Sequence, residues 1–382
     1  MKPYIVFANS VKGHFLEYIH HLYEYCAQMK SHDYIFVVPV EFLEVKQNFT
    51  WSDASNIQFD YISDEELCPS LNTNPIKRSI IFCKILNKRI IRYQADNVFT
   101  LWLIPFIPAA AFMINKRVRI SGIIYKIYLH EEKQLSIRER VYNRVCYQLL
   151  SKRKIFETVF ILNDPESVPR LSNIYNSTKF KNLPDPCIPF KHDKIIDIRK
   201  ELGLSHADNI LLHIGAIDRS KGTMDILDSI NLLNKDQLSK MVFLIIGRIS
   251  SELEIPLFKQ VEKLRIQGAR IIVENHFCSY NRFISFCHSS DVILVPYRRT
   301  SQSSGVIGYA AQLHRPVIAP KDGLLGALVR NNSLGITIDI TPVNLAKAYT
   351  EISKFSVDIK KANNYLQLNS LPSFLLTIGK SL

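Results

Sequence analysis

A regular alternation of short apolar runs with longer amphipathic segments constrains the fold of this chain more than any other feature. The short runs end in polar turns, and the longer segments repeat their apolar residues with a helical period. Such alternation is typical of β-α-β units built around a parallel sheet. In the first half of the chain it predicts strands at Tyr4–Ala8, Tyr34–Val38, Asn97–Leu103, Gly122–Tyr128 and Thr158–Leu162, and helices near Phe15–Met29, Lys77–Arg92 and Arg138–Lys154.

A proline-rich stretch near the middle of the chain interrupts this alternation. Residues 183–194 read LPDPCIPFKHDK, and proline at three of the six positions 184–189 disfavours helix and strand alike. The alternation then resumes, with strands predicted at Asn209–Ile214, Val242–Ile246, Arg270–Val273, Asp291–Val295 and Pro316–Ala319.

The chain has 382 residues, a length that suits two α/β domains better than one hydrophobic core. We expect an N-terminal Rossmann-like domain at residues 1–185, a linker at 186–194 and a C-terminal Rossmann-like domain at 195–382. The last helix is expected to pack back on the first domain. The two parallel sheets should face each other across a central cleft, with ligands at the carboxyl ends of the strands.

The composition indicates a globular protein that attracts anions. Hydrophobic residues make up 47% of the chain and the formal net charge is +13, which favours nucleic acid, anionic membranes or phosphorylated substrates as partners. Seven cysteines without a C-x-x-C pair, and a start without the apolar core of a secretory signal, indicate a cytoplasmic protein. The longest apolar run, Thr100–Ile114, is too short to span a membrane, and we interpret it as a buried strand followed by a helix.

The segment DVILVPYRRTSQSSGVIGYAAQLHRPVIAP, residues 291–320, carries the clearest chemical signal. A buried strand leads into a polar loop and then into Ser303, Ser304 and Gly305 at the start of an apolar helix. Glycine leaves room for a ligand, and the backbone N–H groups at a helix start attract anions, so this turn suits a diphosphate. A plain helix-capping turn is the alternative.

Two further strand ends carry cations. In NILLHIGAIDRSKGTM, residues 209–224, Gly215 permits a tight turn, and Arg219 and Lys221 precede the next helix. There they can neutralise the charge on a departing nucleotide diphosphate, although a solvated basic loop is the alternative. In VFLIIGRIS, Gly247 and Arg248 follow another strand. The fold would bring all these strand ends to one edge of one sheet.

In order and spacing, these segments resemble the donor domain of the family 4 (group 1) retaining glycosyltransferases, which have the GT-B fold. HIGAIDRSKG is similar to the family's Gly-Arg-x-x-x-x-Lys-Gly loop, and FLIIGR matches its mid-domain strand and glycine. Residues 291–329 follow the family's long donor-site block. The likeness covers about residues 208–350 and is weaker in the first half of the chain.

The resemblance implies a sugar transfer from a nucleotide-sugar donor with retention of anomeric configuration, in which positioning and diphosphate stabilisation supply the catalysis. It assigns His130, Arg219 and Lys221 to catalysis, and Gly13 and His14 to the acceptor side; a surface His-Glu-Glu turn is the alternative at His130. The donor-binding residues that it implies are Gly215, Arg248, His276, Ser303, Ser304, Gly305, Val306 and Tyr309. The chain holds no D-x-D motif, and the spacing of its His and Cys residues near position 280 fits no zinc pattern, so we expect neither a metal nor a cofactor.

The chain departs from the family at three positions. The family's block carries two glutamates eight positions apart, and here Ser301 and Tyr309 stand in their places. Ala216 replaces the arginine of the glycine loop. These departures leave the donor sugar and base open, and they raise two alternatives, a non-catalytic GT-B binding subunit and a nucleotide-sugar epimerase.

Two basic stretches fall in the half that should bind the acceptor. Residues 67–95 contain six Lys/Arg and no acidic residue, and residues 116–154 hold eleven Lys/Arg against three glutamates. Basic amphipathic helices can lie on an anionic bilayer, each basic residue adding about 1 kcal/mol; a solvated basic face is the alternative. We therefore expect a peripheral membrane enzyme with a lipid-linked or polysaccharide acceptor, of the kind used in bacterial surface polysaccharide synthesis. Nucleic acid is not expected, because no known nucleic-acid-binding module is evident.

Overall fold

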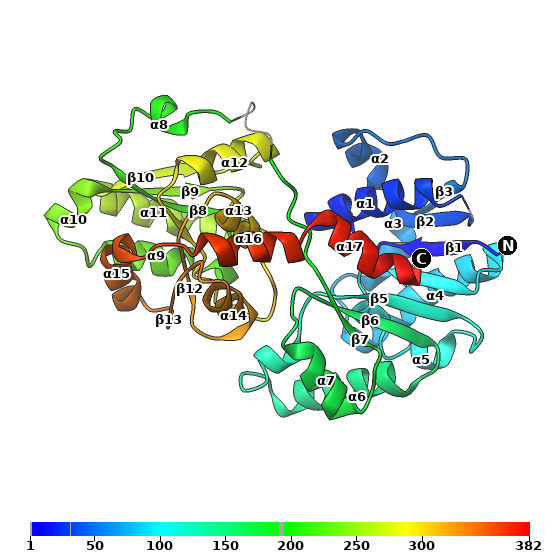
Figure 1. Cartoon of the computed structure of the whole chain (residues 1–382). Helices are drawn as coiled ribbons and strands as arrows, with labels where there is room; N and C mark the ends of the chain where they lie inside the picture. The colour runs from blue at the N-terminus through cyan, green and yellow to red at the C-terminus, as the bar shows by residue number, and fades with distance from the viewer. Residues whose placement is uncertain (1, 31, 191–194) are drawn as a thin grey trace. The chain divides into compact units, whose positions relative to one another are not determined.

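The computed structural model describes residues 2–30, 32–190 and 195–382, and the chain divides into two compact units (Figure 1). Unit 1 comprises Met1–Pro184 and Leu371–Leu382, and unit 2 comprises Asp185–Ser370. Of the linker predicted at 186–194, residues 191–194 lie outside the described residues. Residues 185–190 belong to unit 2, where the Asp185 N–H donates to Asn369 Oδ1 at 3.1 Å and the Cys187 N–H to the Asn369 carbonyl at 2.6 Å.

Unit 1 is built on a parallel sheet that has seven strands in the described part of the chain, in the order β3-β2-β1-β4-β5-β6-β7. The strands are β1 (Tyr4–Phe7), β2 (Tyr34–Pro39), β3 (Ile57–Ile62), β4 (Asn97–Thr100), β5 (Arg119–Ile124), β6 (Phe156–Leu162) and β7 (Phe180–Leu183). The helices are α1 (His14–Gln28), α2 (Phe42–Val45), α3 (Asp64–Leu67), α4 (Pro75–Tyr93), α5 (Ala110–Met113), α6 (Ile137–Lys152), α7 (Ser167–Tyr175) and α17 (Leu371–Ile378), and a 3₁₀ turn, η4, spans Tyr128–His130.

Helices cover both faces of this sheet, because successive residues of a strand point to opposite sides. Ile5 and Phe7 pack in the core that α4, α6 and α7 cover. Val6 and Ala8 face the opposite core, which α1 and α17 cover. Helix α17, drawn in red, lies beside α1 although hundreds of residues separate them in sequence (Figure 1).

Unit 2 repeats this plan with a parallel sheet of six strands among its described residues, in the order β10-β9-β8-β11-β12-β13. The strands are β8 (Asn209–Ile214), β9 (Met241–Ile246), β10 (Arg270–Glu274), β11 (Val292–Leu294), β12 (Val317–Pro320) and β13 (Gly335–Ile338). The helices are α8 (Ile198–Glu201), α9 (Thr223–Ile230), α10 (Lys235–Lys240), α11 (Ser251–Ile266), α12 (Tyr280–Ser289), α13 (Val306–Gln312), α14 (Gly323–Asn331), α15 (Pro342–Glu351) and α16 (Ile359–Leu368). Helices α12, α13, α14 and α16 share one core with the sheet, and α9, α11 and α15 share the other.

The strand order reverses between β1 and β4 in unit 1 and between β8 and β11 in unit 2. In an open parallel sheet, the loops that follow the two strands at such a reversal leave a crevice at the carboxyl edge, where ligands bind. The loop that contains Gly13 follows β1, and the loop that contains Lys221 follows β8. Both glycine loops singled out in the sequence therefore lie at a reversal.

The apolar run Thr100–Ile114 differs from its interpretation as a strand followed by a helix. Strand β4 ends at Thr100, a 3₁₀ turn follows at Ile104–Phe106, and the helical part is the single turn α5. Prolines at 105 and 108 account for this, because each lacks the N–H that a continuous helix or strand would use.

Candidate functional site

At the strand reversal of unit 2, the loop after β8 contacts the loop after β11. The Arg298 N–H donates to the Ser220 carbonyl at 2.8 Å, and Lys221 Nζ lies 3.9 Å from the centre of the Tyr297 ring. The Tyr297 hydroxyl lies 3.4 Å from Ser304 Oγ. The structure thus connects two predicted residues, Lys221 and Ser304, through an aromatic side chain that the sequence analysis did not identify.

Gly222 allows the two loops to approach this closely. Its φ of +72° is a left-handed conformation that favours glycine, and a Cβ at this position would overlap the Pro296 carbonyl oxygen. The glycine after Lys221 is therefore required by the contact that places Lys221 over Tyr297.

A buried histidine, His213, and the Arg298–Asp225 ion pair fix the loops that follow β8 and β11. His213 Nδ1 lies 3.0 Å from the Leu294 carbonyl, which can only accept, so Nδ1 carries the proton and Nε2 accepts from the Thr223 hydroxyl at 2.9 Å. Burial lowers the pKa of His213 to about 4. The Arg298 guanidinium donates to both carboxylate oxygens of Asp225, at 2.7 and 2.8 Å. These contacts tie the ends of β8 and β11 to the start of α9.

Three other side chains predicted for the site lie along the same carboxyl edge but have different surroundings. Arg219 is 73% exposed and pairs with Glu252 at 3.1 Å. Arg248, after β9, is exposed, and His276, after β10, lies 3.1 Å from Glu274. Among the described contacts, none joins these three side chains to Lys221. Gly215 has a φ of +122°, and a Cβ at Gly247 would overlap its carbonyl oxygen, so the turns after β8 and β9 pack directly on each other.

The predicted diphosphate turn leads into α13, which is only seven residues long, with Gly305 as its N-cap. Ser303 Oγ donates to Asp185 Oδ2 at 3.2 Å, and the Val306 side chain is buried. Ser304 Oγ is therefore the hydroxyl of this turn that lies on the Lys221 side, next to Tyr297.

The two positions where the family carries glutamate differ in their environment. Ser301 is fully buried. Tyr309 is half-buried, and its ring lies 5.0 Å from that of Phe283 and 6.3 Å from that of Tyr280, measured between ring centres. An aromatic cluster at the start of α12 and on α13 thus surrounds the second position.

In unit 1, His130 lies at the end of η4, after β5, and faces the turn between β6 and α7. Its Nε2 is 2.7 Å from Asp164 Oδ2 and 3.2 Å from Ser167 Oγ. Burial alone would raise the pKa of Asp164, but hydrogen bonds from His130 and Ser167 hold that pKa below its usual range. The His130 side chain is only 10% exposed, so it does not lie on an open surface turn.

The three residues do not form a nucleophilic triad. In such a triad the serine and the carboxylate bind opposite nitrogens of the imidazole, so that the ring can pass a proton between them. Here both contacts are made to Nε2, and Ser167 is fully buried. The arrangement orients a histidine and does not activate a serine.

Gly13 and His14 lie at the strand reversal of unit 1. Gly13 is the N-cap of α1 with a φ of +59°, and no atom lies within 4 Å of a Cβ built there. The His14 side chain is 62% exposed, with Nδ1 3.2 Å from Glu17 Oε2. Both residues are open to an approaching ligand.

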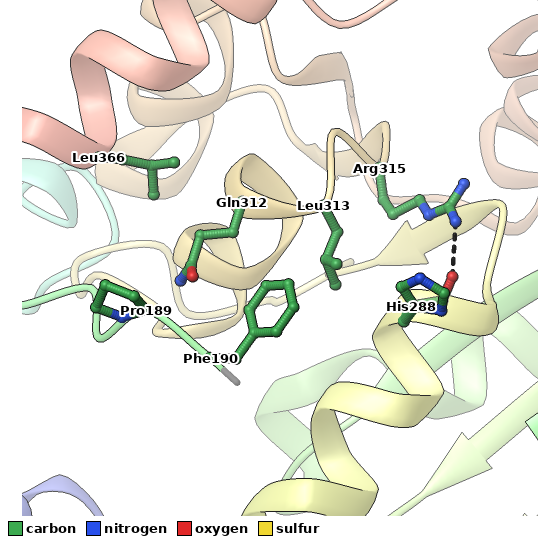
Figure 2. Close-up of a pocket in the computed structure, with 7 residues that line it drawn as sticks. All are labelled: Pro189, Phe190, His288, Gln312, Leu313, Arg315 and Leu366. Atoms are coloured by element: carbon green, nitrogen blue, oxygen red, sulfur yellow. Dashed lines mark hydrogen bonds between the residues drawn. The ribbon is translucent and has the colours of Figure 1, made fainter. Parts of the chain in front are cut away.

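A cavity of about 370 Å³ lies at the opposite edge of the unit 2 sheet (Figure 2). Arg315, which donates to the His288 carbonyl at 2.6 Å, forms one end of it, and Pro189 and Leu366 form the other. His288 and Arg315 precede β11 and β12, so the cavity is at the amino ends of these strands. It is distinct from the loops around Lys221, and no residue predicted for the site lines it.

Within the described residues, no group of three or more His, Cys, Asp or Glu side chains is placed to hold a metal ion. No helix in the same part of the chain is long and apolar enough to cross a membrane.

Two Rossmann-like units, the second with a lysine-glycine loop at its strand reversal, define a protein of the GT-B class. Solved structures share this fold over 99% of the chain. WaaG, a glycosyltransferase involved in lipopolysaccharide biosynthesis, is 13% identical with a TM-score of 0.66 and is covered over 98% of its length. An α,α-trehalose-phosphate synthase (UDP-forming) from Burkholderia vietnamiensis is 11% identical with a TM-score of 0.71, and Alr3699/HepE from Anabaena in complex with UDP is 13% identical with a TM-score of 0.68; each is covered over 99% of its length.

The family model of glycosyl transferases group 1 matches residues 194–365. The resemblance drawn from the sequence is thereby confirmed: these residues match the group 1 glycosyltransferases, in a chain with the GT-B fold. No protein of curated function matches the sequence.

Proposed function

We propose that this glycosyltransferase moves a sugar, with retention of anomeric configuration and without a metal ion, from a nucleoside diphosphate-sugar held by unit 2. The observation that carries this proposal is the meeting of the Lys221 loop with the Tyr297–Ser304 loop at the strand reversal. The carboxyl edge at such a reversal is the ligand-binding edge of an open parallel sheet.

Lys221 is a cation suited to the departing diphosphate. Arg298 is neutralised by Asp225 and Arg219 pairs with Glu252, whereas Lys221 has no acidic partner among the described residues. Its ammonium lies over the Tyr297 ring, an interaction of about 0.5–2 kcal/mol that orients the charge without cancelling it. Lys221 therefore stabilises the negative charge that develops as the sugar leaves.

The nucleotide part of the donor is the least constrained by the residues present. Tyr309 offers an aromatic face and one hydroxyl where the family has a carboxylate, so ribose recognition here differs from that of the family. One structurally similar protein binds UDP, which makes UDP-sugars the first donors to test.

Assays with a panel of UDP-, GDP- and ADP-sugars test the transfer. Lys221→Ala should lower kcat/KM by about 10²–10³-fold, the loss typical for a group that stabilises developing charge. Lys259→Ala, at an exposed lysine of α11, is the matched control and should leave the rate unchanged. Donor binding without turnover by the wild-type protein would instead show a binding subunit, and an epimerised donor would show an epimerase.

Retention of configuration and metal independence are tested by separate measurements. The anomeric configuration of the product, measured by NMR, decides between retention and inversion. Turnover that is unchanged by a chelator is expected if no metal ion takes part, and loss of turnover that Mg²⁺ or Mn²⁺ restores would contradict metal independence.

For the acceptor, we propose a lipid-linked or polysaccharide glycan reached at an anionic membrane surface. Helix α6 exposes Ile137, Val141 and Val145, one above another at four-residue spacing, with side chains 77%, 56% and 49% exposed. Exposed Arg138 and Lys152 lie on the same helix. A basic helix with an exposed aliphatic row suits the interface of an anionic bilayer. The structurally similar WaaG takes part in lipopolysaccharide biosynthesis, which supports a glycan acceptor of that kind.

Helix α4 contributes less to this surface than its sequence predicts. Arg89 is buried against Asp60 and Glu66, Arg92 pairs with Asp60, and Lys88 pairs with Glu66. Three of its six cations are therefore paired within unit 1, so the proposed membrane contact rests mainly on α6.

A further inference from the structure

We propose that Asp164 is a positioning residue of unit 1, which holds the His130 ring with its Nε2–H turned into the unit and so leaves Nδ1 to accept a hydrogen bond from a sugar substrate. This inference rests on the proposed function and adds to it a residue that neither the sequence nor the family resemblance assigns. It stands on the contacts around one imidazole and on the turn that carries the carboxylate.

The contacts determine which nitrogen of His130 carries the proton. Asp164 is 2% exposed in its side chain and lies 2.7 Å from Nε2. An ionised carboxylate only accepts hydrogen bonds, so Nε2 must donate. The same nitrogen also lies 3.2 Å from Ser167 Oγ, so Nε2 has two polar neighbours in unit 1.

The carboxylate is itself held on both oxygens. Oδ1 of Asp164 accepts from the backbone N–H of Ser167 at 3.0 Å, while Oδ2 faces His130. The preceding residue, Asn163, has a φ of +52°, and its N–H donates to the Leu183 carbonyl at 2.7 Å, which ties the turn to β7. The carboxylate therefore has one orientation, and each oxygen has a different partner.

These contacts leave one nitrogen of His130 for a ligand. Nδ1 has no hydrogen-bond partner among the described residues, and it is not among the fully buried polar atoms that lack one, so part of its surface reaches solvent. With Nε2–H directed at Asp164, a neutral His130 offers Nδ1 as an acceptor for a sugar hydroxyl. The ring cannot rotate to offer Nε2 instead without losing the Asp164 contact.

Asp164→Asn makes this proposal testable because the Ser167 N–H determines the orientation of the new amide. The amide oxygen must stay on Ser167 N–H, which places the NH₂ group against His130 Nε2. An NH₂ group only donates, so Nε2 becomes the acceptor and the proton moves to Nδ1. The substitution therefore reverses the tautomer while it preserves size and shape. Glu166→Gln is the matched control, since it makes the same chemical change at an exposed position of the same turn.

The first readout is ¹⁵N NMR of the histidine rings, which distinguishes the two neutral tautomers. The chain has 11 histidines, and the signal of His130 is assigned by its loss in His130→Gln. Wild type and Glu166→Gln should show Nε2–H, and Asp164→Asn should show Nδ1–H. An Nδ1–H tautomer in the wild-type protein would overturn the proposal even if Asp164→Asn does not fold, and an unchanged tautomer in a folded Asp164→Asn would overturn it as well.

The second readout is turnover with the donor that the nucleotide-sugar panel identifies. Asp164→Asn should lower kcat by about tenfold to a hundredfold, by analogy with the partners that orient metal-binding histidines, with donor KM within about twofold of wild type. An unchanged kcat together with a reversed tautomer would remove Asp164 from the site. If the wild-type protein turns over no nucleotide sugar, the transferase proposal fails, while the NMR result still decides how Asp164 orients His130.

Discussion

The backbone at Gly222 has two requirements that only glycine meets, a positive φ and room for the Pro296 carbonyl. Gly203 has a similar φ of +63° but no atom within 4 Å of a Cβ built there. Comparing alanine substitutions at Gly222 and Gly203 therefore separates the free-energy cost of a positive φ from the cost of the overlap with Pro296.

Gly222→Ala should destabilise the protein by about 3 kcal/mol or more, because overlap with the carbonyl adds to the strained backbone. Gly203→Ala should cost about 1 kcal/mol, for the backbone conformation alone. Urea unfolding measures both. Equal losses in the two variants would show that the contact with Pro296 relaxes without cost.

His213 makes stability depend on pH. Its pKa is about 4 in the folded protein and 6.5 in the unfolded chain, so the unfolded chain binds the proton more readily. Stability is therefore full above pH 6.5 and falls as the pH drops towards 4, by about 3 kcal/mol in total. His213→Phe should be less stable at neutral pH, since Thr223 loses its partner, and should show a shallower loss between pH 6.5 and 4. Burial also lowers the pKa of His21 to about 4, which acts equally in both proteins, so identical slopes would contradict the role of His213.

At this scale the sequence singled out the charged and glycine residues that we propose for the site, but not the side chains that contact them. Lys221 and Gly305 stand out because a lysine-glycine loop and a glycine at a helix start suit a diphosphate, and His130 stands out because the family resemblance assigns it. Tyr297 and Asp164 do not, because a tyrosine after a strand and an aspartate before a helix have ordinary structural roles. Tyr297 contacts Lys221, 76 positions away in the sequence, and Asp164 contacts His130, 34 positions away. Both contacts join loops at strand ends that only the folded sheet brings together.

Helix α4 is joined to β3 and α3 through the buried Arg89. Its side chain is 5% exposed and contacts Asp60, which is 4% exposed, and Glu66. The hydrogen bond from Arg89 lowers the pKa of Glu66 to about 2. Among the described residues, removing this guanidinium leaves the buried Asp60 carboxylate with only the exposed Arg92 as its cation, and Glu66 with only the exposed Lys88.

Arg89→Met should therefore cost about 3 kcal/mol or more in the free energy of unfolding. Lys88→Met, which removes a 69% exposed partner of the same Glu66, should cost less than about 1 kcal/mol. Denaturant titration of both variants measures their free energies of unfolding. Comparable losses in the two variants would mean that burial adds nothing to the ion pairs of Arg89 with Asp60 and Glu66.

Three strands escaped the sequence analysis, β3, β7 and β13, and all three lie at the edge of a sheet. An edge strand is covered less than a central one, so its apolar run is shorter and mixed with polar residues. In β3, IQFDYI, only two residues are buried, whereas every residue of the neighbouring β2 is buried. Periodicity therefore predicted the central strands, the edge strand β10 and the fold class, whereas the other three edge strands became evident only in the folded sheet.

The whole molecule has a net charge of +13, and α6 is a surface where an exposed aliphatic row and basic side chains lie together. We expect the protein to sediment with vesicles that contain anionic lipid at low salt and to be released at high salt, because screening weakens the attraction. Sedimentation that does not depend on anionic lipid would contradict the proposed surface.

Val141→Ser on α6 should weaken this binding about fivefold, through loss of about 1 kcal/mol of apolar burial. Val343→Ser on α15 is the matched control, because that valine is 66% exposed and belongs to unit 2. If both variants bind alike, α6 does not enter the lipid interface.

Helix α17 has a consequence for the order in which the protein is made. Phe374 and Ile378 are fully buried in unit 1, and Tyr34 donates to the Leu382 carbonyl. Unit 1 therefore needs residues that leave the ribosome after all of unit 2. Unit 1 is therefore the first to begin synthesis and the last to be completed. Until α17 is made, the apolar surface that it covers in unit 1 stays exposed, and a chaperone could bind there.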